Sequence, residues 1–242
     1  MRAAQLLRAG AGRVRVGRMH VVIAGGHGQI ALLLTEILAA EGHSVTGLIR
    51  KPEQAEDIAA IGGRPIVIDL EQADAEHLAG LLASETDGSV DAVVFAAGAG
   101  PGSGAARKES VDRAASVLLA DAAVAAGVRR FLQISTMGAG TTPDPARDEV
   151  WAAYIEAKTA AEEDLKARDL EWVIVRPGAL TNDAPTGAVL LADPPAGRGE
   201  VTRADVAAVL AELLRTPAVT RRVLELRGGE DAVPDAVSAF AS

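Results

Sequence analysis

The chain has 242 residues, a length that fits one α/β domain or two very small ones. Hydrophobic residues make up 49% and charged residues 24%, so the chain can build a full core. A net charge of −9 and an aromatic share of 2% disfavour binding to nucleic acids or anionic membranes. The absence of cysteine excludes disulfides, thiolate metal sites and cysteine nucleophiles. We therefore expect a globular protein with a small-molecule partner, with no nucleic acid, membrane or metal.

The first 18 residues differ in charge from the rest. They hold five arginines and no acid, and removing these five charges from the net −9 leaves −14 on residues 19–242. The segment lacks the apolar stretch of a secretory signal. Since Met19 stands directly before the first strand-like run, we interpret residues 1–18 as a dispensable extension, with a basic or transit-like arm as the alternative. A cytoplasmic protein is expected.

From Met19 onward, short β-branched runs alternate with Ala- and Leu-rich helical stretches. Strands are predicted at 20–24, 44–49, 65–69, 91–97, 129–135 and 171–176, with weaker ones at 188–191 and 222–226. Helices are predicted at 28–41, 53–60, 74–83, 107–126, 148–168 and 203–215. The pattern indicates an α/β fold over residues 19–242: a single Rossmann-like, doubly wound parallel sheet with helices on both faces. A small C-terminal segment, about residues 178–242, is expected on the substrate side; monomer and homodimer both stay open.

A glycine-rich turn follows the first predicted strand. Gly25, Gly28 and Ala31 form G-x-x-G-x-x-A, and Gly26 with the last two forms G-x-G-x-x-A. Glycine permits a tight turn and lets a pyrophosphate approach the free N–H groups at a helix start. At the first turn of a βαβ unit this pattern favours dinucleotide binding over a plain structural turn. The predicted contacts are Gly25, Gly26, His27, Gly28, Gln29 and Ile30.

The ends of the next three strands indicate the cofactor type. The second strand ends in Arg50-Lys51, where an NAD site would place an acid for the ribose 2′-hydroxyl. Two cations suit a 2′-phosphate, so NADP(H) is favoured over NAD(H), with a solvated loop as the alternative. Asp69 and Leu70 are expected at the adenine, unless Asp69 caps a helix. The small-residue turn on which the cofactor would lie is Ala96, Ala97 and Gly98.

Three residues are candidates for catalysis. Tyr154 is the only tyrosine, and Lys158 follows it four residues later, so the two share one helix face. A neighbouring ammonium stabilises a phenolate, which would make Tyr154 a usable proton donor near neutral pH. Lys158 would also contact the cofactor. Ser135, at the end of the fifth strand, would hold a substrate carbonyl oxygen. The alternative is an amphipathic helix on which the tyrosine packs and the lysine is solvated.

Together these residues, with the run VIVRPGAL at 173–180, resemble the atypical short-chain dehydrogenase/reductases. Residues 19–228 are most similar to the NAD(P)H-binding, NmrA-like branch, which includes flavin and biliverdin-IXβ reductases. The resemblance implies NAD(P)(H) binding and the serine, tyrosine and lysine roles above, and on it Pro177 is counted among the cofactor-binding residues. Members of this branch often lack the tyrosine, and the spacing of 19 positions from Ser135 to Tyr154 exceeds the usual one.

Two functions follow as predictions. The first is an NAD(P)H-dependent oxidoreductase that transfers hydride to a small carbonyl, quinone or flavin-like substrate. The alternative is a non-catalytic NADP(H)-binding redox sensor. Because the chain has so few rings, we expect aliphatic walls rather than aromatic ones around the substrate.

Overall fold

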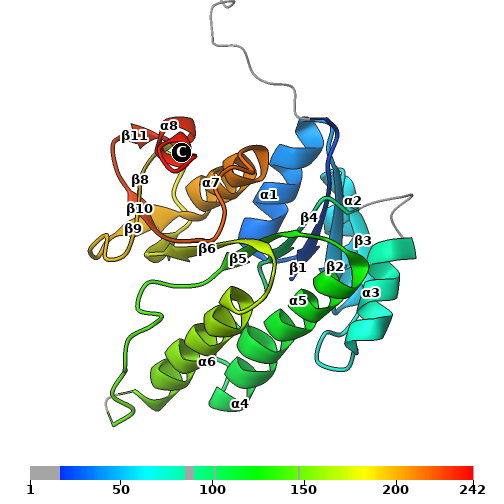
Figure 1. Cartoon of the computed structure of the whole chain (residues 1–242), viewed down its shortest axis with the longest axis horizontal. Helices are drawn as coiled ribbons and strands as arrows, with labels where there is room; N and C mark the ends of the chain where they lie inside the picture. Colours follow the sequence, from blue (N-terminus) through cyan, green and yellow to red (C-terminus); the bar gives the residue numbers. More distant parts are fainter. Residues whose placement is uncertain (1–16, 85–89, 101, 147, 242) are drawn as a thin grey trace, which may run out of the picture.

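The computed structural model describes residues 17–84, 90–100, 102–146 and 148–241 (Figure 1). The predicted N-terminal extension lies, up to residue 16, outside the described residues. Arg18 donates a hydrogen bond to the Ser44 hydroxyl at 3.0 Å, and the buried Met19 precedes the first strand.

The centre of the molecule is a 9-stranded sheet in the order β11-β8-β10-β6-β5-β4-β1-β2-β3. From β10 to β3 every neighbouring pair is parallel, whereas β8 runs antiparallel to β10 and β11 antiparallel to β8. The parallel strands are β1 His20–Ala24, β2 Ser44–Ile49, β3 Arg64–Val67, β4 Ala92–Phe95, β5 Arg130–Ile134, β6 Glu171–Pro177 and β10 Arg222–Gly228. The antiparallel edge consists of β8 Ala188–Ala192 and β11 Asp231–Ala232.

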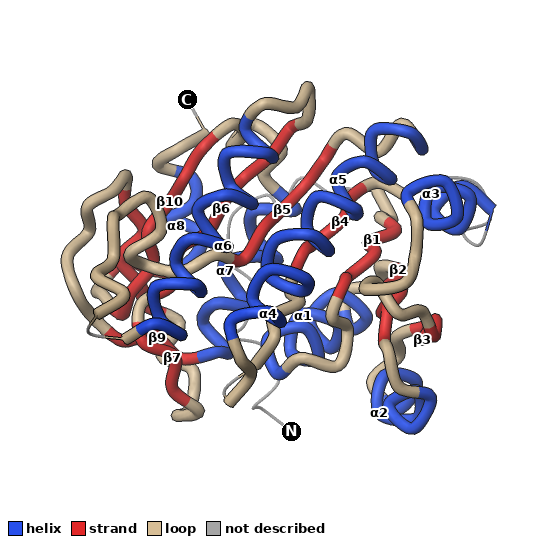
Figure 2. The backbone as a smooth tube through the Cα atoms, turned by 90° about the horizontal axis from the view of Figure 1, so that it is seen from below, coloured by secondary structure: helices blue, strands red, loops and turns tan. Residues whose placement is uncertain are grey.

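Helices cover both faces of this sheet. Helices α1 (Gln29–Ala40) and α7 (Arg203–Arg215) pack on one face together with α8 (Val233–Ser238), and α3 (Ala75–Ser84), α5 (Ala115–Ala126) and α6 (Glu149–Lys166) pack on the other. Figure 2 shows α5 and α6 side by side across the strands. Along β1 the side chains alternate between the two hydrophobic cores, because successive strand residues point to opposite faces. The predicted fold class is thus confirmed, with an antiparallel edge added.

One predicted helix is divided into three parts. The stretch expected as a helix at 107–126 is α4 (Ala105–Arg107), a π-helical turn η2 (Lys108–Ala114) and then α5. A π-helical turn inside a helix is rare and is frequently found at functional sites. In this turn, Lys108 and Asp112 both line the cavity described below.

The remaining short elements escaped the sequence analysis. These are η1 Pro52–Gln54, β7 Ala179–Thr181, β9 Glu200–Thr202, β11 and α8, whereas α2 Ala55–Ala60 lies within the helix expected at 53–60. Strands β7 and β9 form a separate two-stranded parallel sheet. Strands this short lack enough residues for an alternating pattern, so only their long-range pairing reveals them. Among the described residues, no helix is long and apolar enough to cross a bilayer.

Candidate functional site

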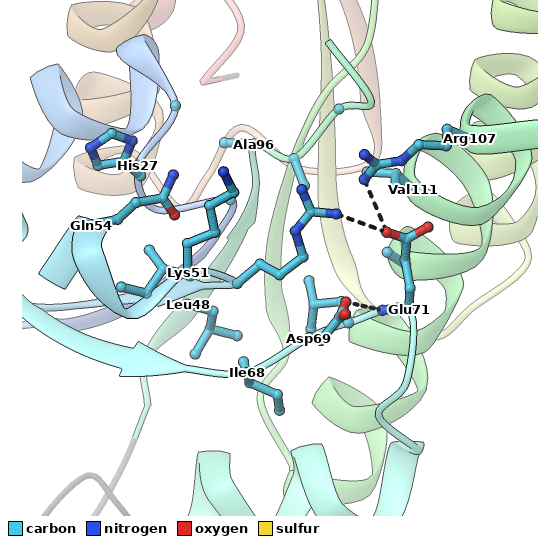
Figure 3. A pocket seen from close by; sticks show the side chains of 18 residues that line it. His27, Leu48, Lys51, Gln54, Ile68, Asp69, Glu71, Ala96, Arg107 and Val111 are labelled. Atoms are coloured by element: carbon cyan, nitrogen blue, oxygen red, sulfur yellow. Dashed lines mark hydrogen bonds and ion pairs between the residues drawn. The ribbon is translucent and has the colours of Figure 1, made fainter. Parts of the chain in front are cut away.

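Two cavities lie at the carboxyl ends of the parallel strands. The first cavity, about 320 Å³, is bordered by the turns after β1, β2, β3 and β4 (Figure 3). The second cavity, about 580 Å³, is bordered by the ends of β4 and β5, the π-helical turn and the start of α6. Ala96, Ala97 and Gly98 line both, so the two cavities meet at the end of β4. This edge is where open α/β sheets bind ligands.

The glycine-rich turn is built on close backbone contacts. Gly25 has φ +77°, and a Cβ there would lie 2.6 Å from the Cα of Ala97. A Cβ on Gly26 would lie 2.6 Å from the Cα of Gly47 on β2. Neither position accommodates a side chain, so the first residues of the motif bring α1 and the neighbouring strands into contact. Gly25 and Gly28 line the first cavity, whereas Gly26 packs against β2 and does not line it.

No side chain caps the N-terminus of helix α1. Gly28 is its N-cap, and its first turn contains no acid. The first N–H groups of a helix have no intrahelical acceptor, and the helix dipole favours an anion there. His27, beside this turn, lies 2.7 Å from the Asp57 carboxylate. The glycine turn and the helix start therefore fit a pyrophosphate.

A group of charged side chains borders the open side of the first cavity. Arg50, Lys51 and Arg107 are the cations, and Glu71 lies between two of them (Figure 3). Its carboxylate is 3.2 Å from Arg50 and 2.9 Å from Arg107, and the Ser110 hydroxyl donates to it at 2.6 Å. The Ser110 hydrogen bond and the two arginines hold the pKa of Glu71 below its ordinary value, against the effect of burial. Glu71 is therefore an anion that partly neutralises the arginines.

Asp69 and Leu70 both line the first cavity, as expected for residues near an adenine. The alternative expectation, that Asp69 caps a helix, is wrong. Its carboxylate accepts the Glu71 N–H at 3.0 Å within a turn. Helix α3 begins several residues later, and Asp74 accepts the His77 N–H at 2.7 Å in its first turn.

The second cavity brings Ser135, Tyr154 and Lys158 together. Tyr154 and Lys158 lie one turn apart on α6, and the Lys158 amine is 5.9 Å from the centre of the Tyr154 ring. This amine lies 3.2 Å from a carboxylate oxygen of Asp112 and donates to the Ile134 carbonyl at 3.2 Å. The side chains of Lys158 and Asp112 are only 5% and 1% exposed, so they form a buried ion pair. Asp112 is a site residue that the sequence analysis missed.

The hydroxyl of Ser135 is engaged inside the protein. It donates to the carboxylate of Glu162 at 2.6 Å, and Glu162 also receives the Arg176 guanidinium through two hydrogen bonds. Glu162 is completely buried and Arg176 nearly so. A serine hydroxyl has one proton, so Ser135 presents only oxygen lone pairs to the cavity in this arrangement. Donation to a substrate carbonyl, the role expected for it, requires the hydroxyl to leave Glu162.

The expectation of purely aliphatic walls is wrong. Trp151 and Tyr154 line the second cavity, with ring centres 5.5 Å apart and planes inclined at 44°. The Trp151 side chain is 48% exposed, and the neighbouring Val150 and Leu180 are also exposed large hydrophobic residues. The chain has few rings, but two of its six aromatic residues lie here.

The remaining predicted residues divide by position. His27, Gly28, Arg50 and Ala96 to Gly98 line the first cavity, and Ile30 lines the second. Gly26, Gln29 and Pro177 line neither cavity. The Pro177 carbonyl accepts the Met137 N–H at 2.9 Å and so ties β6 to the loop after β5. The site residues that sequence reasoning missed are Glu71, Arg107, Lys108, Asp112, Trp151 and Glu162.

Comparison with known proteins places this geometry in a family. A family model described as NAD(P)H-binding matches residues 25–217. The Schizosaccharomyces pombe protein "UPF0659 protein C216.03" is 35% identical over 186 residues, which cover 70% of this chain and 74% of that protein.

Two solved structures extend the comparison. A "Putative NAD-dependent epimerase/dehydratase" from Bacillus halodurans has a TM-score of 0.81 and 30% identity, covering 91% of this chain and 99% of that one. ChuY, described as an anaerobillin reductase from Escherichia coli O157:H7, has a TM-score of 0.70 and 25% identity, covering 87% of this chain and 97% of that one. The matched model spans both the glycine-rich turn and the Tyr154–Lys158 helix, and the chain therefore belongs to the NAD(P)H-binding family.

Proposed function

We propose that this protein is an NADPH-dependent reductase of small planar acceptors, such as a quinone, a flavin-like ring or a conjugated carbonyl. The observation that carries the proposal is the junction of the two cavities at Ala96, Ala97 and Gly98. A dinucleotide that crosses this junction would extend from the cation group of the first cavity to Tyr154 and Lys158 in the second. When bound, its nicotinamide would supply hydride for the reduction.

The first cavity holds the groups that would bind the cofactor. The backbone of Gly25 to Gly28 and the start of α1 would receive the pyrophosphate. Asp69 and Leu70 would border the adenine. Arg50, Lys51 and Arg107 suit a 2′-phosphate, because guanidinium groups bind phosphate through paired hydrogen bonds.

The preference for NADPH has a direct test in Arg50. Arg50→Ala is expected to weaken NADPH binding about tenfold and to leave NADH binding nearly unchanged, since only NADPH carries the 2′-phosphate. Isothermal titration calorimetry with both cofactors measures the two dissociation constants. Arg64→Ala, on the exposed end of β3 away from both cavities, is the control for a lost surface cation. Equal NADH and NADPH affinities in the wild type, unchanged by Arg50→Ala, would refute the assignment.

The second cavity supplies the proton and orients the acceptor. Tyr154 is the candidate proton donor, with water as the alternative, and Lys158 is held beside it by Asp112. Ser135, directly after β5, would orient the acceptor. In this arrangement its lone pairs could accept from an N–H group of a flavin-like acceptor, whereas a quinone or carbonyl oxygen would need the hydroxyl to turn away from Glu162 and donate to it.

The lining of the second cavity favours a planar acceptor over a sugar. A sugar requires several side chains that pair with its hydroxyl groups, whereas Trp151, Val150 and Leu180 offer apolar surface. The relatives described above include both an epimerase/dehydratase and an anaerobillin reductase. The apolar wall supports reduction rather than sugar epimerisation for this chain.

NADPH consumption against a panel of quinones, flavins and carbonyl compounds tests the proposal. Turnover with at least one planar acceptor is expected. Tight NADPH binding without turnover of any acceptor would instead support the alternative, a non-catalytic NADP(H) sensor. One observation favours that alternative: Ser135 and Lys158 are both paired with buried carboxylates.

The variant Tyr154→Phe distinguishes the role of the Tyr154 hydroxyl from that of its ring. The variant keeps the aromatic contact with Trp151 and removes the hydroxyl. If Tyr154 is the donor, kcat is expected to fall about a hundredfold with little change in NADPH affinity. Unimpaired reduction would assign the proton to water.

Residues 19–242 are proposed to act as one cofactor-binding unit in which the segment 178–242 reaches the substrate through Leu180. A chain that begins at Met19 is then expected to keep its NADPH affinity and stability. A large loss of either would show that residues 1–18 are required. The proposed location is the cytoplasm, which fractionation of the source cells would check.

A further inference from the structure

Lys108 is a second lysine beside Tyr154. It lies in the π-helical turn, its side chain is only 8% exposed, and it lines the second cavity. Its amine is 5.0 Å from the centre of the Tyr154 ring, nearer than the 5.9 Å of Lys158. It donates to the Gly100 carbonyl at 3.1 Å. The chain has four lysines, and two of them meet at this ring.

The two lysines differ in how their charges are compensated. Lys158 is paired with the buried carboxylate of Asp112 at 3.2 Å. For Lys108, no ion pair with a carboxylate is found among the described residues; its neighbours are a carbonyl oxygen and a ring face. Asp148, the other acid on the cavity lining, is exposed and accepts the Trp151 N–H as the N-cap of α6. The charge of Lys108 is therefore the one in this cavity that a ligand can neutralise.

The amine of Lys108 also has donors to spare. An ammonium group has three N–H donors, and the Gly100 carbonyl takes one. Burying an ammonium without a counter-ion is costly, and a ligand anion removes that cost. An anion hydrogen-bonded to a buried ammonium forms a charge-assisted bond stronger than a neutral one.

We propose that Lys108 forms an anion-binding subsite of the second cavity, which receives an acidic substituent of the ligand, a carboxylate or sulfonate. Trp151 and Tyr154 border the planar part of the ligand, and Lys108 fixes the acidic group at the side of the π-helical turn. The substrate class is thus a planar, conjugated acid. This inference rests on the proposed function only for the statement that the ligand is the acceptor that is reduced.

The test compares two redox-inert probes of the same ring and nearly the same shape, 2-naphthoate and 2-naphthamide, which differ in charge. Calorimetry on the full-length protein saturated with NADP+ measures both dissociation constants without any turnover. The wild type is expected to bind 2-naphthoate about tenfold more tightly than 2-naphthamide. Lys108→Gln is expected to abolish this preference, and Lys108→Arg, which keeps the charge, to retain most of it.

Arg113→Gln is the matched control. It removes a cation from the same π-helical turn, but Arg113 is exposed, pairs with Glu109 at 2.7 Å and lies outside both cavities. It is expected to leave the preference unchanged. Circular dichroism confirms that each variant is folded.

Several outcomes overturn the inference. The first is a wild type that binds neither probe or shows no preference between them. The second is a Lys108→Gln variant that keeps the full preference. The third is a Lys108→Gln variant whose affinity for NADP+ falls by the same factor, because Lys108 would then be a cofactor contact. A preference that depends on Lys108, in a protein that reduces no acceptor, would support the subsite and refute the reductase. If the protein reduces neutral and acidic acceptors with equal KM, and Lys108→Gln leaves both KM values unchanged, the reductase is supported and the subsite is refuted.

Discussion

The two cavities share a wall but hold their charges in opposite ways. In the first cavity Arg50, Arg107 and Glu71 are partly exposed, and their ion pairs border solvent. In the second cavity Lys158 and Asp112 are almost completely buried. Exposed pairs contribute little to stability and exchange readily for a ligand, whereas a buried charge that loses its partner is costly. The first cavity is therefore suited to exchanging its ion pairs for a cofactor phosphate, and the second to holding its side chains in fixed positions.

The largest effect is expected from breaking the buried pair. Lys158→Met removes the counter-ion of the Asp112 carboxylate, whose other hydrogen-bond partner among the described residues is the Ala99 N–H at 3.1 Å. We expect the free energy of unfolding to fall by about 3 to 5 kcal/mol, because an unpaired buried charge remains. Urea denaturation followed by circular dichroism measures the change.

The double variant Asp112→Asn/Lys158→Met distinguishes structure from function. It removes both charges and keeps an acceptor for Ala99, so most of the lost stability should return. Turnover should stay low, because the Lys158 amine, one of the two amines beside Tyr154, is still missing. A double variant no more stable than Lys158→Met alone would contradict the buried-pair interpretation.

A second large effect is expected at the glycine turn of the first cavity. Gly25→Ala places a Cβ 2.6 Å from the Ala97 backbone and strains a residue at φ +77°. We expect a loss of about 3 kcal/mol in stability and more than about tenfold in NADPH affinity. Gly42→Ala is the control, because Gly42 has φ +85° but no atom near its Cβ position. It should cost only about 1 kcal/mol and leave NADPH binding intact. Similar losses of stability and NADPH affinity in both variants would show that backbone strain alone causes the effect of Gly25→Ala.

The features of the first cavity that the sequence predicted are local ones. Gly25 and Arg50 directly follow strands and Gly28 lies in the same turn as Gly25, and parallel strands bring all such turns to one edge of the sheet. The strand and helix pattern therefore predicted the fold, and it predicted that these turns meet at one edge of the sheet, where the first cavity lies. Asp69 was ambiguous, because an acid after a strand is equally suited to contact an adenine or to cap a helix.

The features that escaped prediction depend on long-range pairing. Glu162 reaches Ser135 across 27 positions of sequence, and Lys158 pairs with Asp112 on a different helix. Lys108 and Asp112 are four residues apart and would share a face of an ordinary helix as well, but their spacing did not indicate that this face borders the second cavity. Composition indicated how few rings the chain has, but not that Trp151 would lie beside Tyr154.

Asp205 provides a third arrangement, a buried carboxylate that forms no ion pair with a cation of the described residues. Burial favours its neutral form, but the Thr186 and Gly187 N–H groups and the Thr186 and Thr202 hydroxyls outweigh this and lower the pKa of Asp205. A carboxylate with a lowered folded pKa stabilises the protein above its unfolded pKa, near 4, and loses that contribution as the pH falls through the folded value.

Asp205→Asn should therefore cost about 2 kcal/mol at pH 7, where the wild-type carboxylate is ionised. The difference in unfolding free energy between variant and wild type should shrink as the pH falls below about 4. Urea denaturation at pH 7, 5, 4 and 3 measures it. A difference that stays constant down to pH 3 would show that packing, not the ionised carboxylate, is responsible.

The smallest effect is expected at the exposed pairs, from Glu71→Gln. Glutamine keeps an oxygen for the Ser110 hydroxyl but removes the negative charge between Arg50 and Arg107. A 2′-phosphate would then meet two arginines that no carboxylate neutralises. Because partly exposed pairs are worth no more than about 1 kcal/mol, we expect NADPH to bind up to about fivefold more tightly, and NADH to change less.

The ratio of NADPH to NADH dissociation constants, measured at low and high salt, checks this last effect. The gain should diminish at high salt, since screening weakens exposed charges. A loss of NADH affinity without any gain for NADPH would mean that Glu71 accepts a ribose hydroxyl. In that case the carboxylate would bind the cofactor directly, and the first cavity would select its ligand by hydrogen bonding rather than by exchangeable charge.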